Sequence, residues 1–181
     1  PLFVYSQTAM QEALDAYRRG FAGRKLHICY AMKANSSLAV LQFFARQGCG
    51  FDIVSGGELD RVVAAGGDPG KVIFSGVGKT RAEMRQALDA SILCFNVESE
   101  AELEVLNSVA LASGQVAPIS IRVKPNVDPQ THPYISTGLK GNQCGIAHER
   151  TLQVYRRVAG LAGLAVRGID FHIGSQITQA T

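Results

Sequence analysis

One lysine at the end of an apolar run is the residue of this 181-residue sequence best placed for covalent chemistry. Lys33 follows residues 26–32, which we expect to form a buried strand, and precedes residues 38–46, which have a helical pattern. Burial at the carboxyl end of a strand favours the neutral amine, and a neutral amine in a cleft can form a Schiff base with an aldehyde. The alternative is a lysine that simply reaches solvent from a strand end, and position alone favours this alternative, because many strands end in lysine.

Two other charged residues lie inside apolar segments that we expect to be strands. Asp52 lies within residues 51–54, and Arg122 lies within residues 119–123. A buried carboxylate needs a partner, so we expect Asp52 either near Lys33 and its ligand or hydrogen-bonded to a loop backbone. Arg122 needs a carboxylate or a bound anion.

His172 follows the last predicted strand, residues 166–171, and is itself followed by Gly174 and Ser175. These three residues offer an imidazole face for stacking, close backbone approach at a glycine, and a hydroxyl donor for an anion. The ordinary alternative is a histidine that only packs at the rim of the core.

Residues 78–80 resemble part of a phosphate-binding P-loop, which would also need a glycine five residues before Gly78. Ile73 occupies that position, so we reject a P-loop. Lys79 is then expected to be a solvated residue at the start of a helix.

Apolar segments alternate with helical patterns along the chain. Strands are expected at residues 3–5, 26–32, 51–54, 72–74, 92–97, 119–123 and 166–171, and helices at about 8–21, 38–46, 57–65, 81–88, 100–111 and 150–159. From residue 26 onward this alternation predicts βαβ units around a parallel sheet, whose uniformly apolar strands should be covered on both faces.

Two parallel architectures compete, an open doubly wound sheet and a (β/α)8 TIM-type barrel. We favour the barrel, because no G-x-G-x-x-G turn follows the strand that ends at Lys33. A complete barrel needs about 250 residues, so we expect an incomplete one with about six of eight strands, in a fragment that also lacks its natural N-terminus. The long connection from residue 125 to 146 is expected to face the substrate.

Composition narrows the class of protein without identifying it. The chain is 46% apolar and 18% charged with a formal net charge of +3, which is ordinary for a globular domain. No basic block or long apolar run is present, so we expect neither a nucleic-acid nor a membrane partner. The four cysteines form no C-x-x-C pair, so we expect no metal site and a reducing, cytoplasmic location.

Four stretches taken together resemble a known family. Residues 30–35 (YAMKAN), 51–59 (FDIVSGGEL), 132–140 (HPYISTGLK) and 172–176 (HIGSQ) are similar to the diaminopimelate decarboxylase branch of the PLP-dependent decarboxylases with an alanine-racemase-like barrel, fold type III. The resemblance covers essentially the whole chain in order. One local departure is Gln143-Cys144-Gly145, where the family usually has Lys-Phe-Gly.

The resemblance implies pyridoxal 5'-phosphate (PLP) as cofactor and a role for each candidate residue. Lys33 would carry PLP, His172 would stack on its ring, Ser175 and Gly174 would contact its phosphate, and Asp52 and Arg122 would line the pocket. It further implies decarboxylation of meso-2,6-diaminopimelate to L-lysine by a homodimer. Decarboxylation of another basic amino acid, a racemase and a PLP-binding barrel without catalysis stay open as alternatives.

The same resemblance places other family features beyond Thr181. These are a glycine-rich phosphate loop, an acidic partner for the pyridinium nitrogen, a proton-donating cysteine and a C-terminal β-domain. We therefore interpret residues 1–181 as a partial PLP-binding barrel domain that is inactive, and poorly soluble, on its own.

Overall fold

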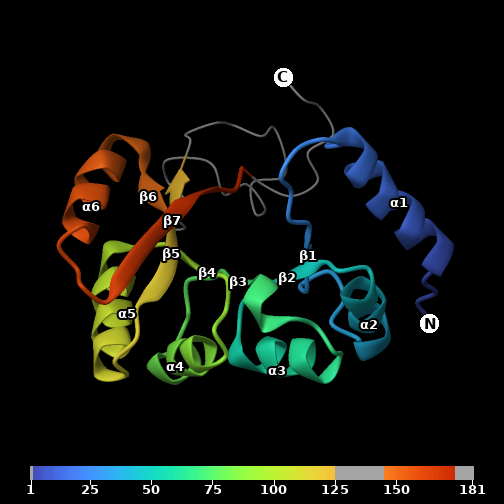
Figure 1. The fold of residues 1–181 in the computed structure, drawn as a ribbon, viewed down its shortest axis with the longest axis horizontal. Coiled ribbons are helices and arrows are strands. Elements are labelled where there is room, and N and C mark those ends of the chain that lie inside the picture. The colour runs from blue at the N-terminus through green and yellow to red at the C-terminus, as the bar shows by residue number, and fades with distance from the viewer. Residues whose placement is uncertain (1, 125–144, 174–181) are drawn as a thin grey trace.

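Strands and helices alternate along the chain in the computed structural model, which describes residues 2–124 and 145–173 (Figure 1). The strands are β1 (Cys29–Ala31), β2 (Gly50–Ile53), β3 (Val72–Phe74), β4 (Cys94–Val97), β5 (Ala117–Lys124), β6 (Ile146–Ala147) and β7 (Leu164–Phe171). The α-helices are α1 (Gln7–Gly20), α2 (Leu38–Arg46), α3 (Gly56–Ala64), α4 (Arg81–Asp89), α5 (Glu100–Ala112) and α6 (Thr151–Val158), and the short 3₁₀ helices are η1 (Pro69–Lys71) and η2 (His148–Arg150).

All of the described strand pairings are parallel, and β1 to β5 neighbour one another in chain order. β7 pairs with β5, and the two-residue β6 pairs with Val123 and Lys124 at the end of β5. Figure 1 shows α2 to α5 in a row along one side of this sheet. The fold is part of a (β/α)8 barrel, which confirms the predicted architecture.

Side chains at the helix starts explain where several helices begin. The hydroxyls of Ser55, Thr80 and Ser99 accept hydrogen bonds from the third backbone N–H of α3, α4 and α5. Glu83 completes a capping box with Thr80 and also accepts a hydrogen bond from Gly56 N at 2.9 Å, which ties the start of α3 to α4.

The structure differs from the predicted elements in several places. Residues 3–5 form no strand, and α1 begins at Gln7, after its capping residue Ser6 and one residue before the predicted start. The first barrel strand is shorter than predicted, because only Cys29–Ala31 pairs with β2. The sequence pattern missed β6, since two residues are too few to produce a recognisable apolar run.

The strands alternate in polarity, contrary to our expectation of uniformly apolar strands. One face packs against the helices through side chains with 0% exposure, among them Phe51, Ile53, Phe74, Phe95, Ile119 and Ile121. The other, inner face carries the alternate positions, among them Asp52, Ile73, Asn96, Ser120 and Arg122. In the part of the chain that the structure describes, α2 to α5 cover the first face, and polar groups lie on the inner face.

Within the described ranges, no helix combines the length and the apolar character that a membrane crossing would require.

Candidate active site

Lys33 lies in a tight turn directly after β1, at the carboxyl edge of the sheet. The turn is closed by a hydrogen bond from Ala34 N to Ala31 O at 3.1 Å, and Met32 N donates to Asp52 O on β2 at 3.1 Å. The Lys33 side chain is exposed, so the predicted desolvation is wrong for this chain. The physical reason is that β1 pairs with β2 alone among the described strands, and no described element covers its other edge.

Asp52 lies half-buried on the inner face and accepts a hydrogen bond from the Ser75 hydroxyl at 2.6 Å. The partner is thus a side chain, not the loop backbone considered above. Burial raises the pKa of Asp52, while the Ser75 hydrogen bond and then the positive charges of Lys33, Arg122 and His172 oppose that rise. The charges of three other predicted residues, Lys33, Arg122 and His172, thus all act on the ionisation of Asp52.

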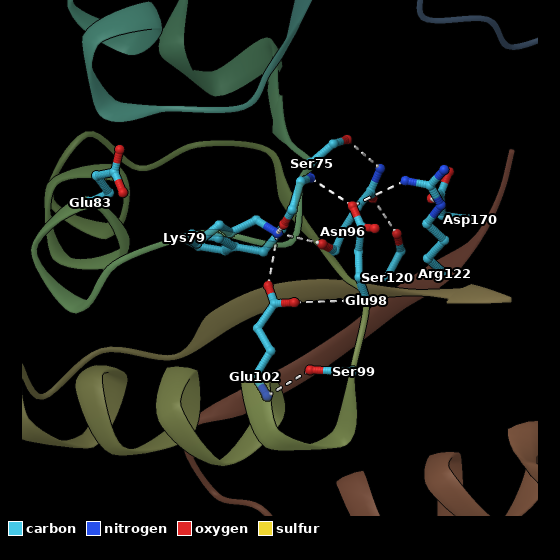
Figure 2. Close-up of polar contacts among 12 residues, drawn as sticks. Ser75, Lys79, Glu83, Asn96, Glu98, Ser99, Glu102, Ser120, Arg122 and Asp170 are labelled. Carbon is cyan, nitrogen blue, oxygen red and sulfur yellow. Dashed lines mark hydrogen bonds and ion pairs between the residues drawn. The ribbon is translucent and has the colours of Figure 1, made fainter. Parts of the chain in front are cut away.

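Arg122 is partnered by carboxylates, which resolves the choice left open by the sequence. Its Nη1 lies 3.0 Å from Glu98 Oε1, and its Nε lies 3.8 Å from Asp170 Oδ2 (Figure 2). Asp170 is the register partner of Arg122 on β7. Glu98 Oε1 also accepts a hydrogen bond from Gly76 N at 2.6 Å, and the Glu98 side chain is only 1% exposed. Among the buried side-chain nitrogen and oxygen atoms of the described residues, Glu98 Oε2 alone has no hydrogen-bond partner.

His172 lies half-buried just beyond β7. Burial lowers the pKa of its imidazole, and the positive charges of Arg122 and Lys33 lower it further, against the opposing charges of Asp52 and Glu98. The ring is therefore mainly uncharged at neutral pH. Gly174, Ser175 and the 132–140 segment lie outside the described residues.

Lys79 is not the solvated residue that the sequence suggested. Its side chain is 0% exposed, and Nζ donates to Gly76 O at 2.7 Å, Asn96 O at 2.8 Å and Glu102 Oε1 at 2.8 Å (Figure 2). It therefore fastens the loop after β3 to the end of β4 and the start of α5.

Sequence reasoning missed the polar residues between these charges, namely Ser75, Asn96, Glu98 and Ser120. A usable signal was present for two of them. Asn96 and Ser120 each interrupt an apolar strand, and an isolated polar residue in a buried strand needs a hydrogen-bond partner.

We expect Asp52→Asn to stabilise the cofactor-free protein at pH 7, by up to about 1 kcal/mol. Because burial raises the folded-state pKa of Asp52, ionised Asp52 opposes folding, whereas an amide keeps the acceptor for Ser75 without the charge. The gain should shrink as the pH falls toward 4, where Asp52 becomes protonated in both states. Thermal melts of the two proteins from pH 4 to 7 measure this, and an equal gain at every pH would contradict it.

The fold defines a class, a parallel α/β barrel protein, and the candidate site at the carboxyl edge of its strands contains a lysine amine, a carboxylate and an imidazole. Residues 7–181 match the family described as pyridoxal-dependent decarboxylase, pyridoxal binding domain. The chain belongs to this family.

Similar proteins agree with that assignment. The chain is 58% identical over 178 residues to diaminopimelate decarboxylase from Vibrio cholerae, covering 98% of the chain and 43% of that protein. It is 58% identical over 179 residues to diaminopimelate decarboxylase from Pseudomonas aeruginosa, covering 99% of the chain and 43% of that protein. The crystal structure of diaminopimelate decarboxylase from Helicobacter pylori complexed with L-lysine matches with a TM-score of 0.93 and 44% identity, over 96% of this chain and 44% of that one. The chain thus spans less than half of the length of these relatives.

Proposed function

We propose that this chain is the cofactor-binding part of a PLP-dependent carboxy-lyase that converts meso-2,6-diaminopimelate into L-lysine and carbon dioxide. The observation that carries the proposal is the shared environment of Lys33, Asp52, Arg122 and His172 at the carboxyl edge of the strands. Identity of 58% to a diaminopimelate decarboxylase over 98% of the chain supports the substrate.

The residues present fit PLP. Lys33 offers an exposed amine that can bond to the cofactor aldehyde, and the neutral imidazole of His172 can stack on a flat ring. Asp52 supplies a negative charge beside both, and Gly174 and Ser175 are the residues we propose for the phosphate. When bound, PLP supplies an electron-withdrawing ring that accepts the electron pair left by loss of carbon dioxide.

Charged residues of the chain itself contribute to the pocket in other ways. Arg122 is held by Glu98 and Asp170, so we propose that it lines the pocket and sets its electrostatics while the carboxylates fix its place. Because the Lys33 amine is exposed, an incoming amino acid can bring its own amine to the same place. We also propose a cytoplasmic homodimer for the full-length protein, on the family resemblance and on the free state of Cys29, Cys49 and Cys94.

Carbon dioxide release tests the proposal. We expect the full-length protein that contains this chain to release carbon dioxide from meso-diaminopimelate and to form an equal amount of L-lysine, in a PLP-dependent manner. Release from ornithine, arginine or lysine alone would favour another decarboxylase. PLP binding without release would favour a non-catalytic barrel, and D/L interconversion would favour a racemase.

A further inference from the structure

A chain of hydrogen bonds crosses four neighbouring strands on the inner face of the sheet and ends at Asp52. The Ser120 hydroxyl on β5 donates to Asn96 Oδ1 on β4 at 2.5 Å, and Asn96 Nδ2 donates to Ser75 Oγ, directly after β3, at 3.1 Å (Figure 2). Ser75 in turn donates to Asp52 Oδ1 on β2 at 2.6 Å. Asn96 and Ser120 are register partners in the sheet, so the backbone itself aligns the first link.

This series of hydrogen bonds has a direction, since every donor points from Ser120 toward Asp52. Ser75 has one hydroxyl proton, and since its oxygen accepts from the Asn96 amide, that proton is left for the Asp52 carboxylate. The ionised Asp52 carboxylate can only accept, so the Ser75 proton is directed to it, Ser75 Oγ accepts from Asn96 Nδ2, and Asn96 Oδ1 is left to accept from Ser120. Donors arranged in series polarise one another, and this strengthens the last bond, which is the one to the carboxylate.

Asn96 is also the most firmly held member of the chain. Its residue is 9% exposed, and its main-chain oxygen accepts a hydrogen bond from the buried Lys79 amine at 2.8 Å. Lys79 is anchored in turn to Glu102 at 2.8 Å, so the end of β4 is fixed from the side of α5 as well. The central link therefore rests on a rigid part of the barrel wall.

We propose that Asn96 is a positioning residue that acts through Ser75 to orient the Asp52 carboxylate toward Lys33 in the cofactor pocket. The proposal deepens the proposed function, on which the identity of the pocket rests. Among the described residues, Asn96 has no hydrogen bond to Lys33 or Asp52, so its effect has to pass through the Ser75 hydroxyl.

The charge state of Asp52 provides a readout that needs no cofactor. The titratable and charged groups around it are Lys33, Cys29, Arg122, Asp170 and His172. Asn96 and Ser75 are uncharged, so replacing either of them leaves all five of these groups in the protein. Because the Ser75 hydrogen bond lowers the pKa of Asp52, weakening that bond should raise the pH at which Asp52 ionises.

The test uses the stability gain of Asp52→Asn as a reporter in the full-length protein without PLP. We would measure the melting temperature with and without Asp52→Asn from pH 4 to 8, in the wild type and in the Ser75→Ala, Asn96→Leu and Ser120→Ala backgrounds. We expect the pH at which the gain levels off to rise by roughly one pH unit in Ser75→Ala, with a correspondingly larger gain above that pH. Smaller shifts in the same direction are expected in Asn96→Leu and then in Ser120→Ala.

Ser113→Ala is the matched control, because the Ser113 hydroxyl bonds only to Val109 O and Ala110 O at the end of α5. We expect no shift there. A levelling-off pH that stays in place in Asn96→Leu and Ser120→Ala while it rises in Ser75→Ala would overturn the proposal, since Ser75 would then act alone. If Asn96→Leu fails to fold, Ser120→Ala decides, because it leaves the amide in place.

The same proteins then separate this inference from the proposed function. PLP binding measured by visible absorbance should weaken at acid pH in the order Ser75→Ala, Asn96→Leu and Ser120→Ala. If the wild type binds no PLP, the proposed function fails, while the melting series still decides whether the chain of hydrogen bonds reaches Asp52.

Discussion

Replacing Lys33 with alanine should abolish decarboxylation by the full-length protein, with a loss of at least about a thousand-fold. Lys33 carries the one primary amine in the predicted site, and the described neighbours Asp52, Arg122 and His172 cannot substitute for it in forming an imine with an aldehyde. Borohydride reduction of the cofactor-loaded wild type followed by peptide mapping should mark Lys33, and the variant should retain no cofactor after reduction.

Two controls separate the nucleophile from the charge. Lys33→Arg keeps a positive charge beside Asp52 but stays protonated at any practical pH, so it should be as inactive as the alanine variant. Lys25→Ala removes an exposed lysine from the segment before β1 and should leave activity unchanged. Cofactor fixed by reduction to a residue other than Lys33 would refute the proposed site.

Lys79→Met should destabilise the protein by about 3–5 kcal/mol, because it breaks a buried ion pair from one side. The Lys79 side chain is 0% exposed and that of Glu102 is 10% exposed, so the variant leaves a carboxylate without its counter-charge. Burial raises the pKa of Glu102, and Lys79 opposes that rise. The deficit should therefore be greatest at neutral pH and should shrink in acid, where Glu102 becomes protonated.

Denaturant titrations at pH 5 and 7 measure this effect, with two variants for comparison. Arg85→Met removes a helical ion pair with Asp89 whose side chains are 51% and 52% exposed, and it should cost at most about 0.5 kcal/mol. Lys79→Met combined with Glu102→Gln should recover part of the loss, because the amide oxygen can still accept from Glu98 N. Equal losses in Lys79→Met and Arg85→Met would show that burial of the pair contributes little.

The elements that sequence predicted well are those with a long periodic pattern. Helix α2 falls at the predicted Leu38–Arg46, and α4 and α5, whose starts are also marked by capping side chains, extend one residue beyond the prediction. β3 was also correct in both bounds. The strand β6 was missed, and the strand predicted at residues 3–5 was wrong. Whether such short segments pair depends on neighbours that are distant in sequence.

The candidate site was predictable in its charges but not in its connections. Lys33, Asp52, Arg122 and His172 could be selected because a charge in or beside an apolar strand requires an explanation. Which partner each one takes depends on the register between strands, which sets Arg122 opposite Asp170 and Asn96 opposite Ser120. The burial of Lys79 was missed for a related reason, because its three acceptors come from three separate segments.

The glycine that precedes β6 restricts how this protein can vary in evolution. Gly145 has a φ of 93°, its N–H bonds to Glu98 O at 3.1 Å, and a Cβ there would lie 3.0 Å from Arg122 O. The family resemblance implies Lys-Phe-Gly here, so Gln143 and Cys144 depart from that pattern whereas the glycine agrees with it. Natural variants and engineered libraries should therefore accept diverse sequences immediately before this position and almost exclusively glycine at it, since any side chain would press on the backbone that carries the pocket arginine.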